Sequence, residues 1–347
     1  MNVKRLKLGF IIGLAGIVGA TTFGVISMPY AIETNTNAYE KAQEILVENT
    51  IDLSEYKEIN KLVVNGEHQS FTINKSNTGY NYIEYRGTKR YPINIDIEFN
   101  DKEKELKLDI KTKLQDEEKR FKKGMSLKNF IDEFLIKEYE NNFIWNDSVG
   151  IYLTDAVDVE INNISNGLDI SDASILKDEL VFNNIYSTDF YLPENHNLKR
   201  LIVNSEGHVD LNSEDLRGIE EIQVNANEFV LSNQDYSKNI EKSEVPAKNI
   251  LINAKDITLN FNDKLAEKIE ISGARDIAIY GNSYIYPYII NSKNIRYYEN
   301  MDDMYNGIYD EEGNNNIELD NLFIGRGNSN TATKVNIKTN IERLMIE

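Results

Sequence analysis

Apolar residues recur along the chain with a period near 21 residues. Four segments, each an apolar residue followed by Asn, lie 21 residues apart, and three related segments follow at intervals of 28, 19 and 19 residues. These segments start at Ile161, Phe182, Val203, Val224, Ile252, Ile271 and Ile290. A fixed period of this length predicts a solenoid, in which each repeat stacks on the next.

A second apolar pair follows within each repeat, at alternate positions typical of a short strand. The pairs are Leu168/Ile170, Phe190/Leu192, Val209/Leu211, Phe229/Leu231, Ile257/Leu259, Ile277/Ile279 and Ile295/Tyr297. Two strands per repeat predict an all-β fold, a parallel β-helix with about 19–21 residues per turn. A leucine-rich repeat is the alternative, because Leu198, Leu201 and Val203 fit its strand pattern. The second strand favours the β-helix.

The repeated asparagines predict a ladder of stacked side chains. Copies stacked about 4.8 Å apart can hydrogen-bond one another through their amides, as in other in-register stacks. The residues expected in this structural ladder are Asn162, Asn183, Asn204, Asn225, Asn253 and Asn291.

Five further strands are expected before the repeats. Alternating or clustered apolar residues separated by turn residues predict strands at 62–64, 71–73, 82–85, 93–97 and 106–110. A short helix is expected over 38–47. An amphipathic helix is expected from Ser126, its N-cap, to Glu140, with an apolar face that includes Phe130 and Phe134.

These patterns predict five regions along the chain. They are a signal anchor or signal peptide (1–31), a linker with a short helix (32–54), a strand-rich N-terminal part (55–125), a helix that caps the repeats (126–141) and the repeats themselves (149–347), with an acidic insertion at about 299–316.

The first residues predict export. Lys4, Arg5 and Lys7 precede an uncharged run of 21 residues over 8–28, long enough to cross a bilayer. The positive charges predict that the N-terminus is cytoplasmic and that the body lies outside a membrane crossed once. A cleaved signal peptide, which would release the protein, is the alternative.

Composition narrows the classes of partner. The net charge of −19 disfavours binding to nucleic acid. The chain contains no cysteine, which excludes disulfides and thiolate metal sites. We therefore expect an exported protein whose partners are the membrane, through residues 8–28, and a cell-envelope protein or glycan.

Chemistry-bearing residues are sparse. His68, His196 and His208 lack metal-ligand spacing, and no cofactor is expected. Asp189 and Asp210 lie 21 residues apart and could face outward on adjacent strands, as a carboxylate pair or a weak calcium site. The acidic stretch 302–312 does not match an EF-hand and is expected to be a solvated insertion.

Tyrosines concentrate near the end of the repeats. Exposed tyrosines suit contacts with sugars and proteins, because each offers an apolar ring and a polar tip. A binding surface is therefore predicted at Tyr280, Tyr284, Tyr286, Tyr288, Tyr297 and Tyr298.

Several segments resemble a known family. The basic N-terminus and glycine-rich apolar run are followed by the segments at 59–73, 82–85, 106–110 and 149–153 and then by the repeats. This order resembles the DUF4097 adhesin-like family of bacterial envelope proteins. The resemblance implies short β-helices on membrane anchors in Gram-positive envelopes and no enzymatic activity. It supplies no functional residues. Thr154, where the family commonly has proline, and the helix at 126–140 depart from its pattern.

The function expected from these observations is non-enzymatic: an adhesin-like interaction module of the cell surface. Two alternatives remain. One is a carbohydrate-active β-helix enzyme, a lyase or a glycosidase, which would need clustered acids with basic or aromatic neighbours. The other is an accessory of envelope-stress sensing that docks on a membrane partner through its apolar segment.

Overall fold

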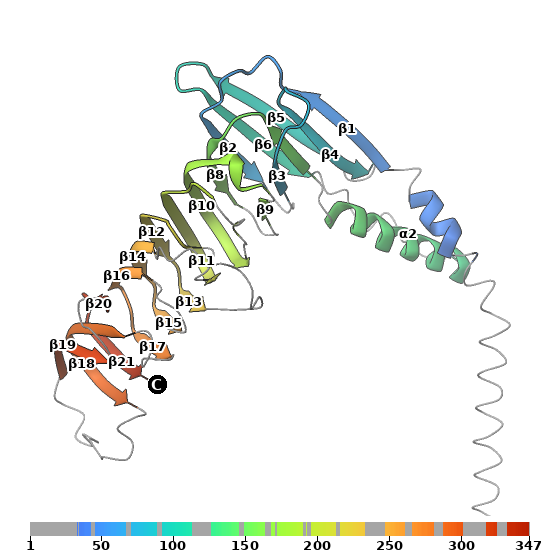
Figure 1. Cartoon of the computed structure of the whole chain (residues 1–347). Helices are drawn as coiled ribbons and strands as arrows, with labels where there is room; N and C mark the ends of the chain where they lie inside the picture. The colour runs from blue at the N-terminus through green and yellow to red at the C-terminus, as the bar shows by residue number, and fades with distance from the viewer. Residues whose placement is uncertain are drawn as a thin grey trace, which may run out of the picture. The chain divides into compact units, whose positions relative to one another are not determined.

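The structure is a computed structural model of the whole chain, and its elements are shown in Figure 1. The residues that it describes are 33, 35–42, 46–66, 71–88, 92–112, 126–145, 149–163, 168–170, 172–189, 192, 196–212, 216–232, 247–260, 266–280, 287–300, 317–324 and 332–346. The chain divides into two compact units. One comprises 1–48, 86–92 and 113–146, and the other comprises 49–85, 93–112 and 147–347.

The first unit contains two helical segments. Residues 35–42 are helical, and α2 spans Leu127–Trp145. Ala38 and Ala42 pack on Ile136 of α2, and the Tyr139 hydroxyl donates to Asn35 Oδ1 at 2.8 Å. The Ser126 side chain accepts from the backbone N–H of Asn129, so the predicted N-cap is confirmed.

The short helix predicted over 38–47 is wrong at its end, because β1 (Leu46–Asp52) begins there. Leu46 and Val47 carry strand hydrogen bonds instead of helical ones, which a local apolar pattern cannot distinguish. The role of α2 as a cap for the repeats stays a prediction.

Most residues of a five-stranded sheet belong to the second unit. Its order is β1, β4 (Tyr82–Thr88), β7 (Val149–Leu153), β3 (Phe71–Lys75) and β9 (Leu168–Ile170). β4 and β7 are antiparallel, whereas β3 is parallel to both β7 and β9. The strand Val149–Leu153, expected to open the repeats, therefore belongs to this smaller sheet.

The larger sheet corrects the predicted fold class. Ten parallel strands are hydrogen-bonded in a closed ring, in the order β12, β14, β16, β20, β18, β21, β17, β15, β13, β11 and back to β12. Their bounds are β12 Glu221–Asn225, β14 Ala247–Asn253, β16 Ala266–Ser272, β20 Thr333–Ile337, β18 Tyr288–Asn300, β21 Ile341–Ile346, β17 Asp276–Tyr280, β15 Asp256–Asn260, β13 Glu228–Ser232 and β11 Arg200–Asn212.

The predicted parallel β-helix is therefore wrong, and the physical reason lies in two long strands. β11 and β18 are each 13 residues long. β11 pairs with both β12 and β13, and β18 pairs with both β20 and β21. These two strands join two branches into one closed sheet. The first branch is β12, β14, β16 and β20, and the second is β13, β15, β17 and β21.

The 21-residue period sets the register of neighbouring strands. Val203 on β11 lies opposite Val224 on β12, and Phe182 on β10 (Leu176–Asp189) lies opposite Val203. Beyond β11 the sheet continues through β10, β8 (Val157–Asn162), β2 (Lys61–Gly66), β6 (Glu105–Thr112) and β5 (Ile93–Asn100), and β19 (Ile317–Ile324) pairs with β18. The short 3₁₀ helix η2 spans Ala173–Ile175.

Alternating side chains form the core. In β12, β13, β15 and β17 every second residue is buried and the residues between them are partly or fully exposed. Phe182, Phe229 and Tyr288 are among the largest fully buried side chains. Alternation places one face of each strand inward, so the other face is available for a site.

Candidate functional site

The asparagine ladder is confirmed for five of its six predicted members. Each side-chain amide donates to the oxygen of the preceding copy: Asn183 to Asn162 at 2.9 Å, Asn204 to Asn183 at 2.7 Å, Asn225 to Asn204 at 2.7 Å and Asn253 to Asn225 at 3.3 Å. Asn162 donates to Asn65, which donates to Asp109, so the ladder continues into the strand-rich N-terminal part.

Asn291 does not belong to this ladder. Its amide donates to Asn336 at 3.1 Å, in a separate pair between β18 and β20. Ser272 occupies the position after Asn253 in register, which ends the series of asparagines. The ladder is structural: its amides hydrogen-bond one another and leave the outward faces of the strands for other contacts.

Of the six tyrosines in the predicted binding surface, one is buried, and the structure does not describe the side chains of four others. Tyr288 is fully buried, so it cannot belong to an exposed surface. Tyr284 and Tyr286 lie outside the described residues, and the side chains of Tyr297 and Tyr298 are also outside the description. Tyr280 is partly exposed at the end of β17.

A row of charged residues crosses the outward face of the second branch. The register places Glu228 on β13 beside Asp256 on β15, and Asp256 beside Asp276 on β17. Arg343 on β21 follows Asp276, while His208 on β11 precedes Glu228 and approaches it at 3.3 Å. Neighbouring strands are about 4.8 Å apart, so three carboxylates lie close together along one line.

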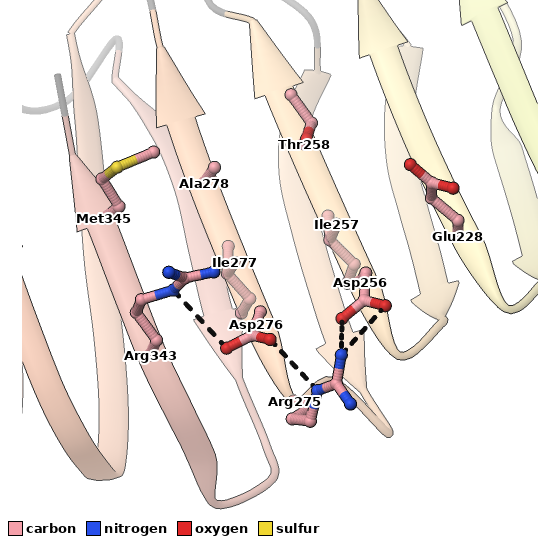
Figure 2. A pocket seen from close by; sticks show the side chains of 10 residues that line it. All are labelled: Glu228, Asp256, Ile257, Thr258, Arg275, Asp276, Ile277, Ala278, Arg343 and Met345. Carbon is pink, nitrogen blue, oxygen red and sulfur yellow. Dashed lines mark hydrogen bonds and ion pairs between the residues drawn. The ribbon is translucent and has the colours of Figure 1, made fainter.

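Two arginines contact two of these carboxylates, Asp256 and Asp276 (Figure 2). Arg275 Nη2 lies 3.0 and 3.3 Å from the two oxygens of Asp256, and Arg275 Nε lies 3.1 Å from Asp276. Arg343 Nε lies 3.6 Å from the other oxygen of Asp276. The hydrogen bond that Arg275 donates to Asp276 and the charge of Asp256 raise the pKa of the Arg275 guanidinium. Arg275 is thereby held in place beside both carboxylates.

A hollow lies beside the charged row because two side chains there are small. Thr258 and Ala278 lie two residues after Asp256 and Asp276 on their strands, and they are opposite each other in register. The residues on either side of them in this row, Val230 and Met345, are larger. The hollow has a volume of about 340 Å³. We call it the arginine–carboxylate groove; its lining residues are Glu228, Asp256, Ile257, Thr258, Arg275, Asp276, Ile277, Ala278, Arg343 and Met345.

Tyr280 extends the same face. Asp276, Ala278 and Tyr280 are alternate residues of β17, all partly exposed, while Ile277 and Ile279 between them are buried. A carboxylate, a small floor residue and an aromatic ring therefore follow one another on one strand face. Tyr280 does not line the groove, but it lies further along the same strand face.

The sequence analysis did not predict the groove, although its acidic residues recur at equivalent positions of successive repeats. Asp189 and Asp210 do lie opposite each other in register, as predicted, but the following positions in that row are Val230, Thr258 and Ala278. The groove acids occupy the row two residues earlier. Arg275, which bridges two of them, lies in a turn before β17, where the repeat pattern assigns no function.

Other predictions find partial answers. Among the described residues, no group of three or more metal-ligating side chains could hold an ion, and the acidic stretch 302–312 lies outside them. The calcium hypothesis stays untested. The helices in the described part of the chain are too short or too polar to cross a bilayer. Residues 8–28 lie outside that part, so the anchor stays a prediction.

No family model matches the chain, and no curated protein is significantly similar to it. Membership of the DUF4097 family is therefore not shown.

Several solved structures resemble the chain at very low identity. A "putative cell adhesion protein" from Clostridium sporogenes is 14% identical, with 87% of this chain and 98% of that one covered and a TM-score of 0.23. A "putative adhesin" from Bacteroides fragilis is 12% identical, with 87% and 96% covered and a TM-score of 0.38. A "putative lipid binding protein" from Parabacteroides distasonis is 12% identical, with 86% and 96% covered and a TM-score of 0.37. Similarity at this level carries no argument about function.

Proposed function

We propose that this protein is a non-enzymatic, adhesin-like interaction module displayed outside a bacterial membrane, and that the arginine–carboxylate groove binds an envelope glycan. The observation that supports this most is the order of side chains on β17. Asp276, Ala278 and Tyr280 present a charged hydrogen-bonding group, a small floor and an aromatic ring on one face.

The chemistry of the groove suits a hydroxyl-rich ligand. Carboxylates and guanidinium groups each offer two hydrogen-bonding atoms in a fixed plane, which fit neighbouring hydroxyls of a sugar. A tyrosine ring can pack on the apolar face of a sugar ring. The ion pairs of Arg275 with Asp256 and Asp276 hold these groups in position before a ligand arrives, which lowers the entropic cost of binding.

The anchored, extracellular location is part of this proposal. It rests on the basic residues and apolar run at the N-terminus of the sequence. A glycan-binding face on a protein tethered to the membrane would meet the cell wall directly.

The groove can be tested with the full chain in lipid nanodiscs and purified Gram-positive sacculi as the probe. Ala278→Arg fills the hollow, and Gln223→Arg places the same side chain on β12 in the other branch as a matched control. We expect Ala278→Arg to weaken retention on sacculi about tenfold, which corresponds to the loss of roughly one good group of polar contacts. The control should bind like the wild type. Equal binding by all three proteins, or no binding by the wild type, would refute the proposal.

One observation supports the enzymatic alternative. Asp256 and Asp276 lie opposite each other on neighbouring strands, which are about 4.8 Å apart. The two carboxyl groups of retaining glycosidases are about 5 Å apart. Arg275 contacts both of them, which suits binding better than a proton donor and nucleophile with separate tasks. Release of reducing ends from sacculi by the wild type, lost in Asp276→Asn, would favour the enzyme.

A further inference from the structure

Exposed apolar side chains concentrate on the two helical segments of the first unit. Among the described residues, five large apolar or aromatic side chains are exposed: Tyr39, Tyr80, Phe130, Ile131 and Phe134. Four of them belong to the segment 35–42 and to α2. The three on α2 are 46%, 42% and 47% exposed. No such side chain is exposed on the described strands of the closed ring.

These side chains of α2 face away from its packed side. At about 100° per residue, Phe130 and Phe134 lie some 120–160° around the helix from Ile136, which is buried against Ala38 and Ala42. Tyr139 continues the packed side, through an edge-to-face contact with Tyr39 at 5.3 Å and its hydrogen bond to Asn35. The helical pair therefore has one side that holds it together and another side on which Phe130, Ile131 and Phe134 are each exposed over more than two fifths of their surface.

The sequence limits how far this helical pair can be from the predicted membrane span. Only six residues separate Met28, the end of the apolar run, from Asn35. An extended chain of that length reaches about 25 Å. Because segment 35–42 packs directly on α2, an anchor over 8–28 would keep α2 within about that distance of the bilayer surface.

We infer that the face of α2 formed by Phe130, Ile131 and Phe134 binds the outer surface of the lipid bilayer. A helix that lies in the interface buries such side chains about 5–10 Å into the boundary between headgroups and acyl chains. The sequence just before α2 is compatible in charge with an anionic lipid surface, because residues 113–124 carry five basic and three acidic residues in an otherwise strongly acidic protein. Four of the basic residues, Lys119, Arg120, Lys122 and Lys123, flank Phe121 in the sequence. This inference rests on the anchor of the proposed function and not on the groove.

The chain offers a clean optical test, because Trp145 is its single tryptophan. The reporter variant carries Trp145→Phe and Phe134→Trp, and the matched control carries Trp145→Phe and Tyr80→Trp, which moves the reporter to the other compact unit. The full chain is reconstituted in phosphatidylcholine–phosphatidylglycerol vesicles with or without brominated acyl chains. We expect brominated lipid to reduce the fluorescence at 134 about twofold or more, since quenching requires burial at acyl depth, and to leave the control unchanged.

Absence of quenching at 134 in protein that floats with the vesicles would overturn the inference. Protein that does not float would overturn both the inference and the anchor, whereas retention on sacculi tests the groove separately. Because the chain has no cysteine, Ile131→Cys can carry a single spin label if the tryptophan variants do not fold. The label should then be more accessible to oxygen than to a water-soluble nickel complex. The reverse preference would contradict burial in lipid.

Discussion

The asparagine ladder and the arginine–carboxylate groove are built from the same stacked strands, yet they follow opposite rules. In the ladder, Asn162, Asn183, Asn204, Asn225 and Asn253 repeat one residue at one position, and each satisfies the next. In the row of residues that crosses the groove, equivalent positions hold different residues, such as Val230, Thr258 and Ala278. Repetition stabilises the stack, whereas departure from repetition creates a hollow with its own chemistry.

Breaking the ladder at its centre should have the largest effect on stability. Asn204→Leu removes two ladder hydrogen bonds and leaves the Asn183 oxygen and the Asn225 amide without their partner. We expect the free energy of unfolding to fall by about 3 kcal/mol, because unsatisfied polar groups cost about 1–3 kcal/mol each and these are only partly buried. Urea denaturation measures the change.

Asn336→Leu is the matched control for this variant. It removes the hydrogen bond of the separate Asn291–Asn336 pair, outside the ladder, and should cost about 1 kcal/mol. Equal losses in the two variants would show that ladder membership adds nothing to stability.

The end of the ladder should be sensitive to a single methyl group. Gly273 has φ of 75°, in the left-handed region, and a Cβ there would collide with Asn253 Oδ1. Gly273→Ala should therefore lower the free energy of unfolding by about 2 kcal/mol, from backbone strain together with displacement of the Asn253 amide. Thermal or urea unfolding measures this.

Gly218→Ala separates strain from collision. Gly218 has a similar φ of 79°, but nothing lies within 4 Å of a Cβ built there. It should cost about 1 kcal/mol, the conformational part alone. If Gly218→Ala is as destabilising as Gly273→Ala, then contact with the ladder is not the cause.

The groove should respond in binding and hardly at all in stability. Arg275→Gln removes ion pairs of a side chain that is 56% exposed, so the free energy of unfolding should change by less than about 1 kcal/mol. Binding to sacculi should nonetheless weaken, because Arg275 holds both Asp256 and Asp276.

Arg200 provides a matched control for Arg275. It also bridges two carboxylates, Glu179 at 2.8 Å and Glu221 at 3.0 Å, but it lies outside the groove. Arg200→Gln should leave binding unchanged. Equal loss of binding in both variants would point to net charge instead of the groove.

The smallest effect is expected in acid, at the N-terminal end of the ladder. The hydrogen bond from Asn65 lowers the pKa of Asp109 from its ordinary value of 3.8. Because its pKa is lower in the folded state, ionised Asp109 stabilises the folded protein above pH 3.8. This stabilisation is lost as the pH falls through the folded-state pKa. The melting temperature of Asp109→Asn should therefore fall less than that of the wild type between pH 6 and pH 3.

Glu342→Gln, a change of an exposed carboxylate on β21, controls for the loss of one negative charge. It should follow the wild type through the same pH range. An identical acid response of Asp109→Asn and the wild type would mean that the Asn65 hydrogen bond does not contribute to stability.

Local pattern was sufficient to predict many strands and the register between them. Ile257 and Leu259 alternate with polar residues, and this alone places them inward on β15. The 21-residue spacing places Asn204 beside Asn225, because parallel strands from equivalent repeats pair without a shift. These features depend on residues that are neighbours in sequence or exact copies of one another, so they can be read without coordinates.

Only the tertiary structure decided how the sheet closes and where the groove lies. Closure depends on β11 and β18, whose pairing with both branches brings together residues with no shared local signal. The groove joins Asp256, Arg275 and Arg343, and Arg343 is 67 residues after Asp276, beyond the regular repeats. The burial of Tyr288 and the exposure of Phe134 were likewise decided by packing between distant elements, because a side chain's own sequence neighbourhood does not determine what covers it.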